Sequence, residues 1–139
     1  MDFSFDFKKY ENIEDFFYRG IICDKHNLQE KCEYPEDYDI RLEKITDGMD
    51  DYVDEAIKNN MVQCNSSDPD AICGMDFDFV PGLHIQIDFV HSVGIIPYIK
   101  INDKISDMFY GSLGNLMKLL IFNKDEIIND LEMYKKSKS

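Results

Sequence analysis

Residues 75–89 read MDFDFVPGLHIQIDF, and this stretch decides the fold. Apolar and polar side chains alternate on both sides of the dipeptide Pro81-Gly82. A period of two places the apolar side chains of a strand on one face, and Pro-Gly is typical of a tight turn. The stretch therefore predicts a hairpin of two antiparallel strands with one apolar and one polar face.

The strand pattern continues on the C-terminal side of this hairpin. Ile95 to Ile101 form a third strand-like run after the turn-like Ser92-Val93-Gly94, and Pro97 indicates an edge strand. Before the hairpin, residues 64–74 have the composition of a loop. Residues 2–7 alternate Phe with Asp and Ser, which predicts a short half-buried strand.

Helical patterns surround these strands. We expect a short helix from Asn12 to Ile22 and a long one from Pro35 to Asn59, which begins with a proline. A third helix is expected to include Ile105 to Leu120, although Gly111 and Gly114 could bend or split it. The last covers Asp125 to Lys136, preceded by a capping arrangement of Asn123 and Glu126. The prediction is a single α+β domain over residues 1–139: an antiparallel β-meander packed with about four α-helices.

The formal charge of −13 is confined to one part of the chain. Residues 1–79 contain 21 Asp and Glu against 8 Lys and Arg, whereas residues 80–139 contain 7 of each. The acidic part also holds 12 of the 18 Phe and Tyr residues, so we expect it to fold. An acidic excess disfavours direct contact with nucleic acids or anionic membranes, which carry the same sign. We interpret residues 1–79 as partner-facing and residues 80–139 as a neutral scaffold.

The predicted helix from Pro35 to Asn59 carries the strongest candidate site. Opposite its apolar stripe, Glu43, Asp47, Asp50 and Asp54 recur at helical spacing, with Asp51 beside them. Like charges at this spacing destabilise an isolated helix by about 0.2–0.5 kcal/mol per pair. Two interpretations stay open: a solvated face of an acidic protein, or a ridge that docks into a basic cleft. The spacing does not fit a calcium-binding loop.

Neighbouring acidic and aromatic residues extend this candidate surface, because tyrosines are favoured interface anchors and carboxylates speed encounter with a basic partner. Tyr38 belongs to the apolar stripe and is expected in the core. The predicted partner-binding residues are Tyr34, Glu36, Asp37, Asp39, Glu43, Asp47, Asp50, Asp51, Asp54, Asp68 and Asp70.

No catalytic, metal or cofactor motif is found in the sequence. His84 and Asp88 share one strand face and could form an acid–base pair, but no nucleophile motif is near and a solvent-facing surface explains them. The four cysteines lack the ligand spacing of zinc sites and are expected to be free thiols, with the disulfides Cys23–Cys32 and Cys64–Cys73 as the alternative. The acidic start lacks the pattern of a signal peptide, and no apolar run is long enough to span a bilayer. We expect a cytoplasmic protein without enzymatic activity, cofactor or metal.

In its length, acidity and absence of catalytic motifs, the chain resembles the small acidic immunity proteins of bacterial toxin systems, including contact-dependent growth inhibition. The resemblance implies a basic toxin or nuclease domain as partner, neutralised by stoichiometric binding. Two alternatives remain: a DNA mimic that competes for several DNA-binding proteins, or a non-catalytic adaptor module.

Overall fold

The computed structural model describes residues 4–29, 55, 58, 71–92 and 94–139, apart from the side chains of residues 71–75, 89–92 and 94–96. This part of the chain contains a four-stranded antiparallel sheet of order β1-β2-β3-β4. The strands are β1 (Ala71–Val80), β2 (Leu83–Ser92), β3 (Gly94–Ile101) and β4 (Ile105–Met108). The helices are η1 (Phe7–Lys9), α1 (Ile13–Asp15), η2 (Phe16–Lys25), α4 (Leu113–Phe122) and α5 (Lys124–Lys138). The predicted α+β class is confirmed.

The predicted hairpin is formed by β1 and β2. Val80 pairs with Leu83 around the Pro81-Gly82 turn, and Gly82 has a φ of 87°, a conformation that favours glycine. The pairing continues to Ala71, opposite Val90. The prediction of a loop over residues 64–74 is therefore wrong for residues 71–74, because β2 is long enough to hydrogen-bond them as strand. Residues 64–70 lie outside the described residues.

Strand β3 is not an edge strand, so that interpretation of Pro97 is wrong. It pairs with β2 on one side and with β4 on the other. The register with β4 begins at Tyr98, one residue after the proline. The Pro97 carbonyl accepts a hydrogen bond from the Phe109 backbone N–H at 2.9 Å. A proline is tolerated here because the ladder with β4 starts after it.

The structure splits the predicted helix from Ile105 to Leu120. Its first four residues form β4, which follows a turn with positive φ at Asn102 and Asp103, 50° and 60°. Asn and Asp tolerate this left-handed conformation and favour a hairpin, which overrides the helical spacing of the apolar residues. Helix α4 begins only at Leu113, after Ser112, whose hydroxyl accepts a hydrogen bond from the Asn115 N–H at 3.2 Å.

The N-terminal segment packs on helices instead of forming a strand. Residues 4–6 have no regular structure and η1 follows, so the strand predicted over residues 2–7 is wrong where it is described. The rings of Phe5 and Tyr134 each lie with their centroids 4.7 Å from that of Phe16, and the Phe7 ring lies at 5.6 Å. The alternating aromatic side chains pack against helices here, so the segment needs no neighbouring strand.

The helix predicted from Asn12 is confirmed and extends to Lys25. The Asn12 side chain accepts a hydrogen bond from the Asp15 N–H at 2.8 Å and so caps the first turn. From Phe16 the helix widens to a π-helix. Gly20 is required by close packing, because a Cβ atom there would lie 2.9 Å from Cδ1 of Phe16.

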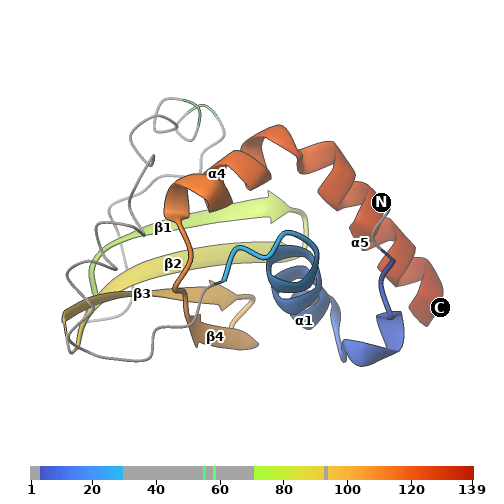
Figure 1. Ribbon diagram of the computed structural model, residues 1–139, viewed down its shortest axis with the longest axis horizontal. Coiled ribbons are helices and arrows are strands. Elements are labelled where there is room, and N and C mark those ends of the chain that lie inside the picture. Colours follow the sequence, from blue (N-terminus) through green and yellow to red (C-terminus); the bar gives the residue numbers. More distant parts are fainter. Residues whose placement is uncertain (1–3, 30–54, 56–57, 59–70, 93) are drawn as a thin grey trace.

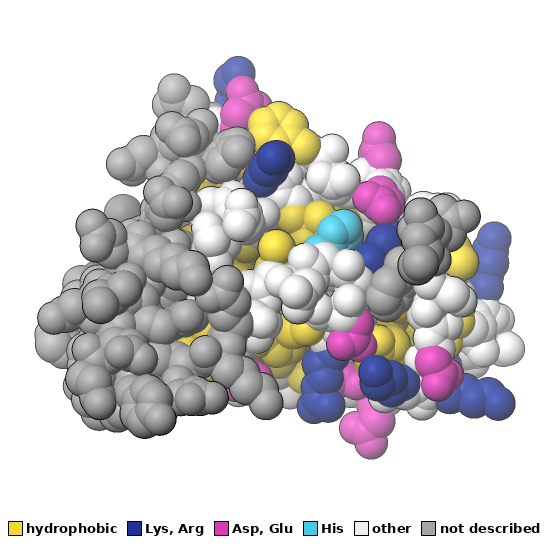
Figure 2. Space-filling view, viewed as in Figure 1, with side chains coloured by type: hydrophobic (Ala, Val, Ile, Leu, Met, Phe, Trp, Pro, Cys, Tyr) yellow, Lys and Arg dark blue, Asp and Glu magenta, His cyan; other side chains and the backbone are white. Residues whose placement is uncertain are grey.

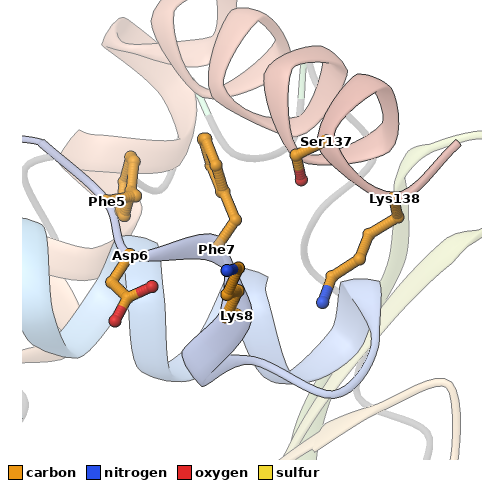
Figure 3. Close-up of a pocket in the computed structure, with 6 residues that line it drawn as sticks. All are labelled: Phe5, Asp6, Phe7, Lys8, Ser137 and Lys138. Carbon is orange, nitrogen blue, oxygen red and sulfur yellow. The ribbon is translucent and has the colours of Figure 1, made fainter.

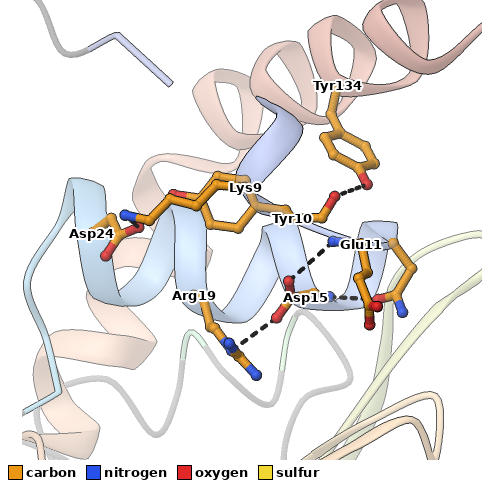
Figure 4. A network of polar contacts seen from close by, with 8 residues as sticks. Lys9, Tyr10, Glu11, Asp15, Arg19, Asp24 and Tyr134 are labelled. Carbon is orange, nitrogen blue, oxygen red and sulfur yellow. Dashed lines mark hydrogen bonds and ion pairs between the residues drawn. The ribbon is translucent and has the colours of Figure 1, made fainter. Parts of the chain in front are cut away.

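A polar network fixes this N-terminal helix against α5 (Figure 4). The Tyr134 hydroxyl donates to the Tyr10 carbonyl at 2.8 Å, and the Tyr10 hydroxyl donates to Asp24. The ammonium of Lys25 lies 2.7 Å from Asp130 and 2.9 Å from Glu126. Apart from the bond between Tyr10 and Asp24, these contacts join residues more than 100 positions apart in the sequence.

Helix α5 confirms the last predicted helix, with small shifts of both ends. Asn123 does not form the capping bond to the backbone; its side chain donates to the Glu126 carboxylate at 3.2 Å. In Figure 1, α4 lies over the sheet, and α5 continues past the end of the sheet and packs on the N-terminal helix. The core comprises the inner sheet face and the facing helix residues, among them Phe16, Phe17, Ile21, Ile22, Phe77, Ile85, Ile87, Ile99, Ile101, Leu113, Leu116, Ile127 and Leu131.

Candidate functional site on the polar face of the sheet

All eleven predicted partner-binding residues lie outside the described residues, so they remain predictions. They are Tyr34, Glu36, Asp37, Asp39, Glu43, Asp47, Asp50, Asp51, Asp54, Asp68 and Asp70. The same holds for the helix predicted from Pro35 to Asn59, of which only Glu55 and Lys58 are described.

The described residues contain a second polar surface, on the sheet face opposite the core. Antiparallel pairing places directly opposed residues on the same face. The register opposes Asp78 to His84, Asp76 to Gln86, and Gln86 to Lys100. We call Asp76, Asp78, His84, Gln86, Asp88 and Lys100 the polar sheet face.

His84 lies between two carboxylates at the hairpin end of this face. Its Nδ1 atom lies 2.8 Å from Oδ1 of Asp78, and its Nε2 atom contacts Asp76. An ionised carboxylate only accepts hydrogen bonds, so both ring nitrogens can donate only when the imidazole is protonated. The hydrogen bond to Asp78 raises the pKa of His84, against an opposing effect of burial. With both nitrogens occupied as donors, this histidine is poorly placed to act as a general base.

Asp88 is fully buried, which corrects the expectation that it faces solvent together with His84. Its side chain has 0% exposure and is compensated by the Lys100 ammonium, 3.2 Å from Oδ2. The Gln86 amide donates to both carboxylate oxygens, at 3.1 and 2.9 Å. A buried carboxylate needs such partners, because an unpaired one would lose its hydration without replacement. Asp88 and His84 therefore differ in role: one is held in the interior and the other stays near the surface.

The exposed end of the polar sheet face carries a net negative charge. Side-chain exposure is 34% at Asp76, 74% at Asp78 and 43% at His84, so two carboxylates surround one imidazolium. On the face of the molecule seen in Figure 2, by contrast, the described acidic and basic side chains are interspersed.

The described residues offer little for catalysis or metal binding. Among them, no group of three His, Cys, Asp or Glu side chains is placed to hold a metal ion. Cys23 is a free, half-buried cysteine, and burial raises the pKa of its thiol to about 11. It is therefore protonated at neutral pH and a weak nucleophile. No helix in the described ranges has both the length and the hydropathy needed to cross a membrane.

The sequence contained a signal for the His84 cluster that composition alone did not reveal. A two-residue Pro81-Gly82 loop sets Val80 opposite Leu83, which brings positions 78 and 84 together on the polar face. The ion pair of Asp88 and Lys100 required the pairing of β2 with β3.

His84 should make the folded state more stable at about pH 6 than at about pH 9. A group that binds its proton more tightly in the folded state stabilises the fold below its unfolded pKa, and this stabilisation is lost as pH rises through the folded pKa. The stabilisation is therefore lost over the pH range from 6.5, the ordinary pKa of histidine, up to the raised pKa of His84. The effect should stay below about 1 kcal/mol, because the cluster is partly exposed.

Urea unfolding of the wild type and His84→Gln across this pH range would measure the effect, with the ring titrated by NMR. Burial lowers the pKa of His26, which gives the opposite pH dependence, and the difference between the two proteins removes that contribution. An equal pH dependence in both proteins would contradict the prediction.

The fold thus belongs to the α+β class, with an antiparallel sheet that presents one polar face. Comparisons with protein-family models, curated proteins and solved structures find no match to this chain.

Proposed function

We propose that this protein binds a basic protein partner and inhibits it by stoichiometric binding, as immunity proteins neutralise toxin domains. The observation that carries the proposal is the confinement of the acidic excess to residues 1–79, 21 acidic against 8 basic side chains. Such an excess speeds encounter with a basic partner and disfavours wrong ones. The carboxylates would take the place of the phosphates that a nuclease cleft accepts.

The proposal divides the chain into an acidic partner-facing part, residues 1–79, and a neutral scaffold, residues 80–139. Asp76 and Asp78 belong to the acidic part and are partly or largely exposed beside the hairpin turn. Residues 80–139 supply most of the described core, from Leu83 to Tyr134, and the rest comes from residues 10–22 and 77–79. An acidic surface on a well-packed scaffold suits binding with little change of shape.

The finer features of the proposal come from the sequence. We propose one domain with a β-meander and a fourth helix from Pro35 to Asn59, whose acidic face contacts the partner. The protein would act in the cytoplasm without catalysing a reaction. Tyr34 would serve as an aromatic anchor within the contact, because tyrosines contribute strongly at the centres of interfaces.

Reversing two charges of the acidic helix tests the proposed contact. We expect Asp47→Lys with Asp50→Lys to weaken binding of the partner by about 10- to 100-fold, because each lysine would face a basic surface. The proposal predicts that a toxin domain is encoded next to the gene for this chain. That domain is the partner tested, and affinity is measured by calorimetry at two salt concentrations.

Asp125→Lys with Glu132→Lys provides the matched control. Both residues are exposed on α5, and the control changes the net charge by the same amount. Equal losses in the two variants would show a general charge effect and overturn the assignment of the contact to this helix. Absence of any 1:1 complex would overturn the inhibitor proposal itself. Displacement from several unrelated DNA-binding proteins by duplex DNA would favour a DNA mimic instead.

A further inference from the structure

A pocket of about 240 Å³ lies where the N-terminal segment meets the end of α5 (Figure 3). Its lining combines residues from both ends of the described chain: Phe5, Asp6, Phe7, Lys8, Ser137 and Lys138. No part of the polar sheet face contributes to it, so the two surfaces are separate.

The pocket has a preformed apolar wall. The rings of Phe5 and Phe7 are stacked, with centroids 5.8 Å apart, and that of Phe7 lies 6.1 Å from the Tyr134 ring. Both phenylalanines pack against Phe16, which is fully buried in the core. The aromatic wall is therefore held by the core and does not need a ligand to order it.

Two lysines bring positive charge to this apolar wall. Lys8 follows Phe7 on one side of the pocket, and in Figure 3 the side chain of Lys138 extends from the end of α5 on the other side. Among the described residues, neither ammonium has a carboxylate within ion-pair distance; that of Lys138 lies 5.4 Å from the Tyr134 ring centroid.

Of the polar side chains that line the pocket, only the two lysines are suited to bind an anion. The Ser137 hydroxyl already donates to the Tyr134 carbonyl at 2.7 Å, so its one proton is used. The Asp6 carboxylate lines the pocket but points away from Lys138 in Figure 3. An apolar wall beside two ammonium groups is complementary to an anion that has an apolar body.

We propose that this pocket binds a small carboxylate with an apolar body, such as an aryl or alkyl acid. The apolar body lies against Phe5 and Phe7, and the carboxylate lies between Lys8 and Lys138. This binding site goes beyond the proposed inhibition and does not depend on it, because no residue of the acidic helix takes part.

NMR titration of the full chain with phenylacetate tests the site. We expect saturable shifts of the amide signals of Phe7, Lys8, Ser137 and Lys138, with a Kd on the order of 1 mM for so small a ligand. Acetate lacks the apolar body and benzyl alcohol lacks the charge, so each should bind at least about fivefold more weakly. Equal shifts with acetate, or shifts that do not saturate, would overturn the proposal.

Substitution of the lysines assigns the charge contribution. Lys8→Gln and Lys138→Gln should each weaken phenylacetate binding about two- to fivefold, the usual effect of an exposed ion pair. Lys136→Gln removes an exposed lysine of the same helix that does not line the pocket, and should leave binding unchanged. An equal loss in all three variants would show nonspecific attraction and overturn the site.

Discussion

Phe16→Ala is expected to lower the free energy of unfolding by about 3–5 kcal/mol, a large part of the total for a domain of this size. Phe16 has 0% exposure, and its ring contacts those of Phe5, Phe7, Tyr10 and Tyr134. Deleting the ring removes buried apolar surface and leaves a cavity between the N-terminal segment and α5. Urea unfolding followed by circular dichroism measures the loss.

Met133→Ala on α5 is the control for removing an apolar side chain. Met133 is 45% exposed, so its truncation should cost less than about 1 kcal/mol. Phe16→Leu keeps most of the apolar volume and should be milder than Phe16→Ala. A loss below about 1 kcal/mol in Phe16→Ala would contradict the central position of this ring.

Gly111→Ala should destabilise the protein by about 3 kcal/mol or more and lower Tm on the order of 10 °C. A Cβ atom at Gly111 would lie 1.6 Å from the Leu28 carbonyl oxygen, so the backbone itself would have to move. The neighbouring Gln29 fixes this approach: its amide donates to the Met108 carbonyl at 2.7 Å and accepts from the Tyr110 N–H at 2.6 Å. The backbone therefore has little freedom to relax.

Gly82→Ala is the control that measures the conformational cost of replacing a glycine without a steric clash. Gly82 has a φ of 87°, and a Cβ atom added there would meet no other atom within 4 Å, so only backbone strain of about 1–2 kcal/mol is expected. If Gly111→Ala unfolds no more easily than Gly82→Ala, the close approach to Leu28 is not rigid. Scanning calorimetry of the two variants and the wild type decides between these results.

Local pattern predicted the elements whose partners are close in the sequence. The hairpin of β1 and β2 follows from alternation around Pro81-Gly82, and the start of the N-terminal helix follows from the capping side chain of Asn12. Both depend on contacts within a few residues, which a sequence pattern encodes directly.

Patterns that fit more than one kind of structure gave the errors. Phe5 and Phe7 alternate as in a strand but pack on Phe16 and Tyr134. Ile105 and Met108 have helical spacing but pair with β3. In both cases the apolar periodicity is present in the sequence, but contacts in the folded protein decided which secondary structure the segment adopts.

The candidate sites divide in the same way. Composition located the acidic excess, and the short hairpin loop brings His84 near Asp78. The burial of Asp88 beside Lys100 depends on a third strand, and the pocket at Phe7 and Lys138 joins the two ends of the chain. Such sites are absent from any local pattern, because their residues become neighbours only on folding.

The sequence by itself determined the α+β class, the hairpin and the confinement of negative charge to residues 1–79. These depend on residue types and short-range spacing, which hold before any long-range contact forms. Only the tertiary structure decided that β3 is internal, that Asp88 is buried, and that two lysines from opposite ends of the chain line one apolar pocket. The physical reason is that burial and long-range pairing are properties of the packed chain, set by competition among all its apolar surfaces.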